Sequence, residues 1–75
     1  MSESFWLEVT GEEPELFADY GDACATLNRW ADDLQAAGWH VNRGWASRDN
    51  LYAVHATAPR AEAIERFGQV VRDEP

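Results

Sequence analysis

Residues 22–38, with the sequence DACATLNRWADDLQAAG, contain the clearest helix signal in the chain. Their apolar side chains recur at steps of four and three, the spacing of one face of an α-helix, at Ala23, Leu27, Trp30, Leu34 and Ala37. The carboxylate of Asp22 can accept hydrogen bonds from the first free backbone amides of a helix, and Gly38 suits the left-handed residue that ends one. We therefore predict a helix between Asp22 and Gly38, whose apolar stripe must pack against other elements.

The residues before this helix predict one strand and one irregular segment. Residues 5–10, FWLEVT, alternate with period two, so residues 5, 7 and 9 share one face of a strand and residues 6, 8 and 10 the other. Residues 11–22 are rich in acids and are interrupted by Pro14 and Gly21, yet Leu16, Phe17 and Tyr20 have helical spacing. We predict a loop there that holds one or two helical turns.

After Gly38, two apolar segments predict a β-hairpin. Residues 39–46 and 51–58 flank the polar tetrad Ser47-Arg48-Asp49-Asn50, whose composition is typical of a tight turn. Pairing residue 46 with residue 51 places residues 39, 41, 43 and 45 on the same face as residues 52, 54, 56 and 58, the expected core face. Arg43 belongs to this face and must lie near its rim.

The end of the chain predicts a second helix. Pro59 fits the first turn of a helix, where its missing amide proton costs nothing. Ile64, Phe67 and Val71 then give that helix an apolar side.

Together these elements predict an α+β fold in the order β-α-β-β-α. A right-handed crossover through the first helix gives a three-stranded antiparallel sheet of order 1-3-2, with both helices on one face. This topology resembles a ferredoxin-like fold that lacks its final strand. In such a fold the strand at residues 5–10 is an exposed edge, and Trp6 stands on the helix-free face.

Length and composition predict a single domain over residues 1–75. The chain is 45% hydrophobic and contains four Trp, which favours a folded protein despite a net charge of -8. The acidic start of the chain has the character of neither a signal peptide nor a membrane anchor, so we expect a cytoplasmic protein. Cys24 is the only cysteine, which excludes an internal disulfide.

The negative charge is concentrated in the first half of the chain. Residues 1–37 contain nine acidic residues and one basic residue, Arg29, whereas residues 38–75 contain five of each. An acidic field of this kind repels a nucleic-acid duplex, and the chain has no Lys for phosphate contacts, so direct nucleic-acid binding is disfavoured.

No residue pattern predicts an enzyme, a cofactor or a metal site. His40 and His55 fall on the same predicted sheet face, but no third ligand accompanies them. Cys24 lies in the apolar stripe of a helix, where a small buried side chain is the ordinary interpretation. Ser47 has no base beside it, and an enzyme would need a pocket that gathers His40 or His55 with a carboxylate.

We therefore hypothesise a small protein-binding module whose partner is a larger protein or nucleoprotein complex with a basic groove. Dense carboxylates attract such a groove over long range and then pair with its arginines. In size and acidity the chain resembles the small acidic inhibitors of phages and mobile elements, among them anti-restriction and anti-CRISPR proteins, that mimic DNA. The predicted contact residues are Glu12, Glu13, Glu15, Asp19, Asp22, Asp32, Asp33 and, as an aromatic anchor, Trp6.

Two alternatives explain the acidity without a basic partner. A salt-adapted protein carries acids for hydration, although it should then carry them over its whole surface, and residues 38–75 are neutral. A homodimer joined through the edge of the first strand and Trp6 would use its acids for solubility only.

Overall fold

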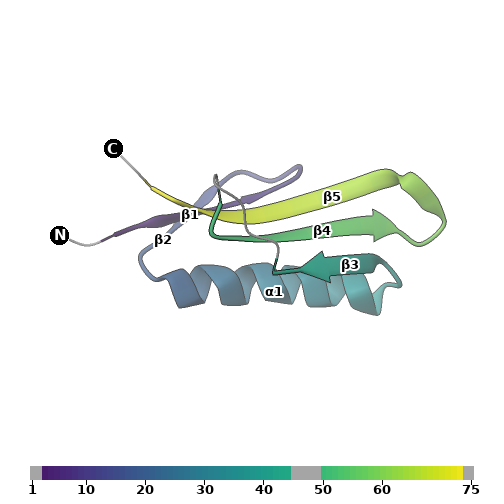
Figure 1. The fold of residues 1–75 in the computed structure, drawn as a ribbon, viewed down its shortest axis with the longest axis horizontal. Coiled ribbons are helices and arrows are strands. Elements are labelled where there is room, and N and C mark those ends of the chain that lie inside the picture. Colours follow the sequence, from purple (N-terminus) through teal and green to yellow (C-terminus); the bar gives the residue numbers. More distant parts are fainter. Residues whose placement is uncertain (1–2, 45–49, 74–75) are drawn as a thin grey trace.

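A computed structural model of the chain describes residues 3–44 and 50–73, with the backbone alone at residues 61–63 (Figure 1). Its elements, in chain order, are β1 (Phe5–Val9), β2 (Glu15–Phe17), α1 (Tyr20–Ala36), β3 (His40–Arg43), β4 (Tyr52–Ala58) and β5 (Ala61–Arg72).

All five strands form one antiparallel sheet, and α1 lies along one of its faces (Figure 1). The strand order is β2-β1-β5-β4-β3. The chain therefore makes a hairpin, crosses through α1 to the far edge of the sheet, and returns strand by strand until β5 pairs with β1. The α+β class was predicted correctly, whereas the three-stranded sheet with two helices was wrong.

The predicted second helix is a strand. Residues 61–72 form β5, the longest strand, and its central position lets both β1 and β4 pair with it. The helical spacing of Ile64, Phe67 and Val71 is misleading, because the same segment contains Gly68 and the β-branched pair Val70-Val71, which favour a strand. Pro59 lies in the turn between β4 and β5 and not at a helix start.

The acidic segment 11–22 holds a strand and no helical turn of its own. Residues 15–17 form β2 and pair with β1, while Tyr20 already belongs to α1. Because β2 pairs with one edge of β1 and β5 with the other, β1 is an inner strand and not the exposed edge that the sequence predicted. The edges among the described residues are β2 and β3.

The first helix was predicted correctly, apart from its start. The N-cap is Asp19, whose Oδ2 accepts a 3.0 Å hydrogen bond from the backbone amide of Asp22, so Asp22 lies inside the first turn. At the other end Gly38 has a φ of +95°. The amides of Gly38 and Trp39 donate to the carbonyls of Gln35 and Leu34, both at 3.0 Å, which is a Schellman motif.

The predicted hairpin has the predicted register. His40 pairs with Thr57 and Arg43 with Val54, as the predicted alignment requires. Trp45, Ala46, Ser47, Arg48 and Asp49 lie outside the described residues. The faces follow the prediction, because Val41 and Val54 pack toward α1 while His40 and His55 share the opposite face.

The core lies between α1 and the sheet. Its fully buried large side chains are Leu27 of α1, Val54 of β4 and Val70 of β5, and each contributes roughly 1.5–3 kcal/mol to folding. Ala23 and Ala31 are also fully buried, and their small size lets α1 pack close to the strands. Trp6, predicted for the helix-free face, lies there, since it alternates with the buried Phe5 and Leu7.

Candidate protein-binding surface

Three exposed carboxylates follow β1: Glu12 and Glu13 lie in the connection between β1 and β2, and Glu15 is the first residue of β2. Gly11 at φ +82° and a 3.0 Å hydrogen bond from the amide of Glu12 to the carbonyl of Val9 form the turn that carries them. The three residues line a hollow of about 90 Å³ whose remaining walls are Leu7, Val9, Thr26 and Trp30. The turn thus holds its acids beside the middle of α1.

The flank of α1 that faces this turn carries further acids. Asp22, Thr26 and Asp33 are spaced by four and seven residues, so they lie along one side of the helix. Because Thr26 lines the hollow beside Glu12, this is the side next to the turn. We call Glu12, Glu13, Glu15, Asp22 and Asp33 the acidic surface. Arg29 also falls on this flank.

The acidic surface is free of ion pairs in the part of the chain that the structure describes. The pairs found there are Asp32–Arg43 at 2.6 Å, His55–Glu65 at 3.3 Å and Glu3–Arg72 at 4.0 Å, and none involves the acidic surface. None of its five carboxylates is therefore held in an ion pair within the described residues.

Two predicted contact acids have other contacts. The Asp19 carboxylate caps α1, as described above. Asp32 lies on the opposite flank of the helix, where Arg43 of β3 binds it. Sequence could not predict that Asp33 belongs to the acidic surface while its neighbour Asp32 pairs with Arg43. This difference depends on the side of α1 on which the hairpin β1–β2 lies.

Trp6, the predicted anchor, lies on the helix-free face and borders a second hollow. Its indole Nε1–H donates a 3.0 Å hydrogen bond to Oδ1 of Asp73. The hollow measures about 450 Å³ and is lined by Trp6, Glu8, Glu13 and Pro14. Glu13 thus connects the acidic surface to the hollow at Trp6.

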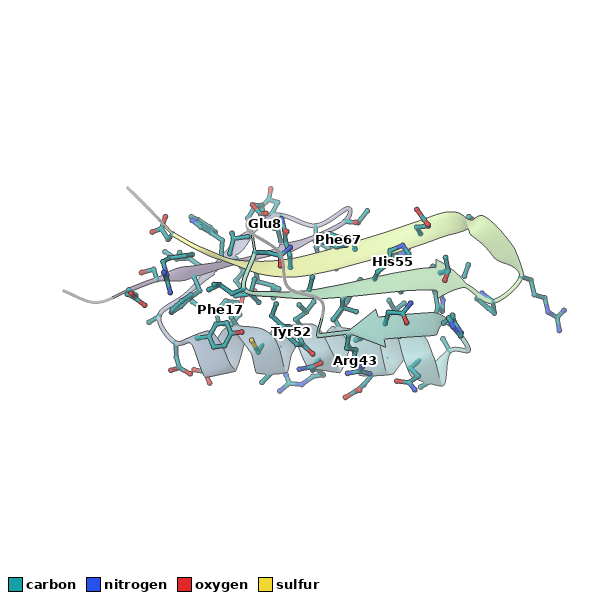
Figure 2. All side chains as sticks on the ribbon, in the orientation of Figure 1. Glu8, Phe17, Arg43, Tyr52, His55 and Phe67 are labelled. Atoms are coloured by element: carbon teal, nitrogen blue, oxygen red, sulfur yellow. The ribbon has the colours of Figure 1, made fainter. Side chains whose placement is uncertain are left out.

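The helix-free face also holds a histidine–carboxylate pair that the sequence did not reveal. Nε2 of His55 lies 3.3 Å from Oε1 of Glu65, whose side chain is 58% exposed. The pair was missed because Glu65 was assigned to a helix; strand alternation would have placed it beside His55. Figure 2 shows His55 on the side of the sheet away from α1. Among the described residues, no group of three or more potential ligands could hold a metal ion.

Cys24 is half-buried and packs against the core. A hydrogen bond with Cys24, and to a smaller extent burial, raise the pKa of the Tyr20 phenol above its ordinary value of 10.0. The Tyr20 hydroxyl also donates to the carbonyl of Leu51 at 3.3 Å, which ties the start of α1 to the residue before β4.

No family model, curated protein or solved structure matches this chain. Within the described residues, no helix has both the length and the apolar character needed to cross a membrane.

Proposed function

We propose that this protein binds a basic surface of a larger protein through its acidic surface. The observation that carries the proposal is the placement of Glu12, Glu13 and Glu15 beside the flank of α1 that holds Asp22 and Asp33, without an ion pair among the described residues. Unpaired charges of one sign on one side of a small domain lower the stability of the folded state, since they repel one another. They suit an oppositely charged partner.

The partner that fits this chemistry is a protein whose basic groove normally holds nucleic acid. Carboxylates presented together attract such a groove at a distance, raise the rate of encounter and then pair with its arginines. The protein would act by occupying the groove, in the manner of the acidic inhibitors with which phages and mobile elements block restriction or CRISPR complexes.

The test is capture of the partner at low salt from cells in which the protein occurs. Wild type is compared with the triple variant Glu12→Gln, Glu13→Gln, Glu15→Gln. The matched control, His40→Lys, Asn42→Lys, Glu65→Gln, shifts the net charge by the same amount at exposed residues of the other face.

We expect wild type and the control to capture the same protein, and the triple variant to lose it. Added duplex DNA should release the captured protein, as should salt raised to about 1 M, where the Debye length is about 3 Å. Capture that survives in the triple variant, or that resists both salt and DNA, would refute the proposal.

A further inference from the structure

The hollow at Trp6 combines an aromatic ring, a proline ring and two carboxylates. Trp6 and Glu8 come from β1, and Glu13 and Pro14 from the turn that follows it. Trp6 and Glu8 are half-buried, while Glu13 and Pro14 are exposed. Figure 2 shows Glu8 on the side of the sheet away from α1. A shallow and open hollow that is lined in part by two carboxylates does not fit an anion, because it offers two negative charges.

Two of the four lining side chains are held in place by hydrogen bonds. Asp73 accepts from the Trp6 indole at 3.0 Å, which fixes the ring. Oε1 of Glu8 accepts a 2.7 Å hydrogen bond from Nε2 of Gln69, and Asn50 in turn donates to Gln69 at 3.3 Å. Because these groups are ordered before a ligand arrives, binding costs little further side-chain entropy.

We propose that this hollow receives an arginine side chain of the basic partner. A guanidinium group is planar, so it can stack on the Trp6 ring, and its N–H groups point outward in its own plane toward Glu8 and Glu13. A lysine ammonium carries the same charge but cannot stack as a plane or bind two carboxylates at fixed angles. The same chain places an arginine over a tryptophan elsewhere, since the guanidinium carbon of Arg66 lies 5.6 Å from the Trp39 ring centroid.

This inference rests on the proposed function, because it names the group by which the basic partner is recognised. The probes are two end-blocked peptides of equal charge, tri-arginine and tri-lysine, titrated into the full chain at low salt. The reporter is the NMR signal of the Trp6 indole N–H, assigned by its loss in Trp6→Leu. We expect tri-arginine to shift this signal and to bind about fivefold more tightly than tri-lysine.

Two neighbouring glutamates supply a matched pair of variants. Glu13 lines the hollow at Trp6, whereas Glu12 does not line that hollow and lies in the one beside α1. Glu13→Gln should abolish the preference for tri-arginine. Glu12→Gln removes the same charge. It should lower the affinity for both peptides by a similar factor and keep the preference for tri-arginine. In Trp6→Leu, where the backbone amide of Glu13 replaces the indole as reporter, the preference should also vanish.

The peptide titrations distinguish failure of the arginine site from failure of the proposed function. Equal affinities for the two peptides, with an unmoved Trp6 indole and shifts confined to the acidic surface, would overturn the arginine site and leave the proposed function standing. If neither peptide binds at low salt, both the arginine site and the proposed function are overturned. An indole signal that changes with protein concentration, without peptide, would show that a second copy occupies the hollow and would also overturn the arginine site.

Discussion

Gly68 lies in the middle of β5, at the point where α1 packs onto the sheet. A Cβ atom at this position would overlap Cδ1 of Leu27 and lie 3.2 Å from Cζ3 of Trp30. Leu27 is fully buried, so its side chain has no free space into which it could move. Gly68 is therefore needed for the distance between helix and sheet, and its φ lies outside the left-handed region, so backbone strain is not the reason.

Substituting Gly68→Ala should destabilise the fold by about 1–3 kcal/mol, the usual cost of an overpacked core. Urea unfolding of wild type, Gly68→Ala, Leu27→Val and the double variant measures this cost. Because the shorter Val leaves room for the new methyl group, the Leu27→Val change should cost less in the Gly68→Ala background than in wild type. Simple additivity of the two costs, or a Gly68→Ala protein as stable as wild type, would contradict the steric explanation.

At the scale of elements, Arg43 joins the edge strand β3 to α1. Its guanidinium donates to Asn28 Oδ1 at 3.0 Å, to Asp32 Oδ1 at 2.6 Å and to Gln35 Oε1 at 2.9 Å. Tyr52 of β4 donates to the same Asn28 oxygen at 2.8 Å, so two strands contact the same side chain of the helix. Figure 2 shows Arg43 and Tyr52 directed toward α1. Arg43 belongs to the core face of the hairpin, and its side chain thus forms polar contacts with the helix there. We call its hydrogen bonds to Asn28, Asp32 and Gln35 the polar seam.

Removal of this seam should weaken the attachment of β3. We expect Arg43→Met to cost about 1–2 kcal/mol, since several hydrogen bonds to one charged group are lost but Asp32 is 67% exposed and partly screened. Arg72→Met is the control, because Arg72 approaches Glu3 only to 4.0 Å and its change should stay within about 0.5 kcal/mol. Thermal unfolding of both variants gives the comparison; equal losses would show that the seam contributes nothing specific.

The sequence predicted the elements whose signals are local. Alternation gave β1, the apolar stripe with Gly38 gave α1, and the polar tetrad gave the β3–β4 register. The sequence-based prediction failed where the type of element depends on pairing with strands that are distant in the sequence. Residues 61–72 can present an apolar side either as a helix or as a strand, and two flanking strands with unpaired edges select the strand. The three-residue β2 is too short to show a period of its own.

At the scale of the molecule, the fold brings some acids of the first half together and separates others from them. The turn after β1 and one flank of α1 come together as the acidic surface, whereas Asp32 is neutralised on the other flank by Arg43. Sequence could predict that residues 12–15 lie close together, since they are adjacent. It could not predict the hollow at Trp6, because Glu8 and Glu13 face it only after β2 has folded back along β1.

The structure limits which interface the alternative function, a homodimer, could use. An edge contact through β1 is excluded, because β2 and β5 pair with both of its sides. What is left of the predicted interface is a contact through the helix-free face, where Trp6 lies and where Leu16 of β2 is 51% exposed. Two copies that each carry a net charge of -8 repel one another, so we expect a monomer near physiological ionic strength.

Sedimentation equilibrium of wild type, Trp6→Ala and Leu16→Ser over a range of protein concentrations and at low and high salt tests this expectation. A monomer at every concentration in both salts, for all three proteins, would agree with a surface that awaits a different and basic partner. A dimer that forms only when salt screens the charge would show that repulsion alone keeps the helix-free faces apart. A dimer already present at low salt, and lost in Trp6→Ala or Leu16→Ser, would mean that the acids serve solubility and that the apolar face is the true interface.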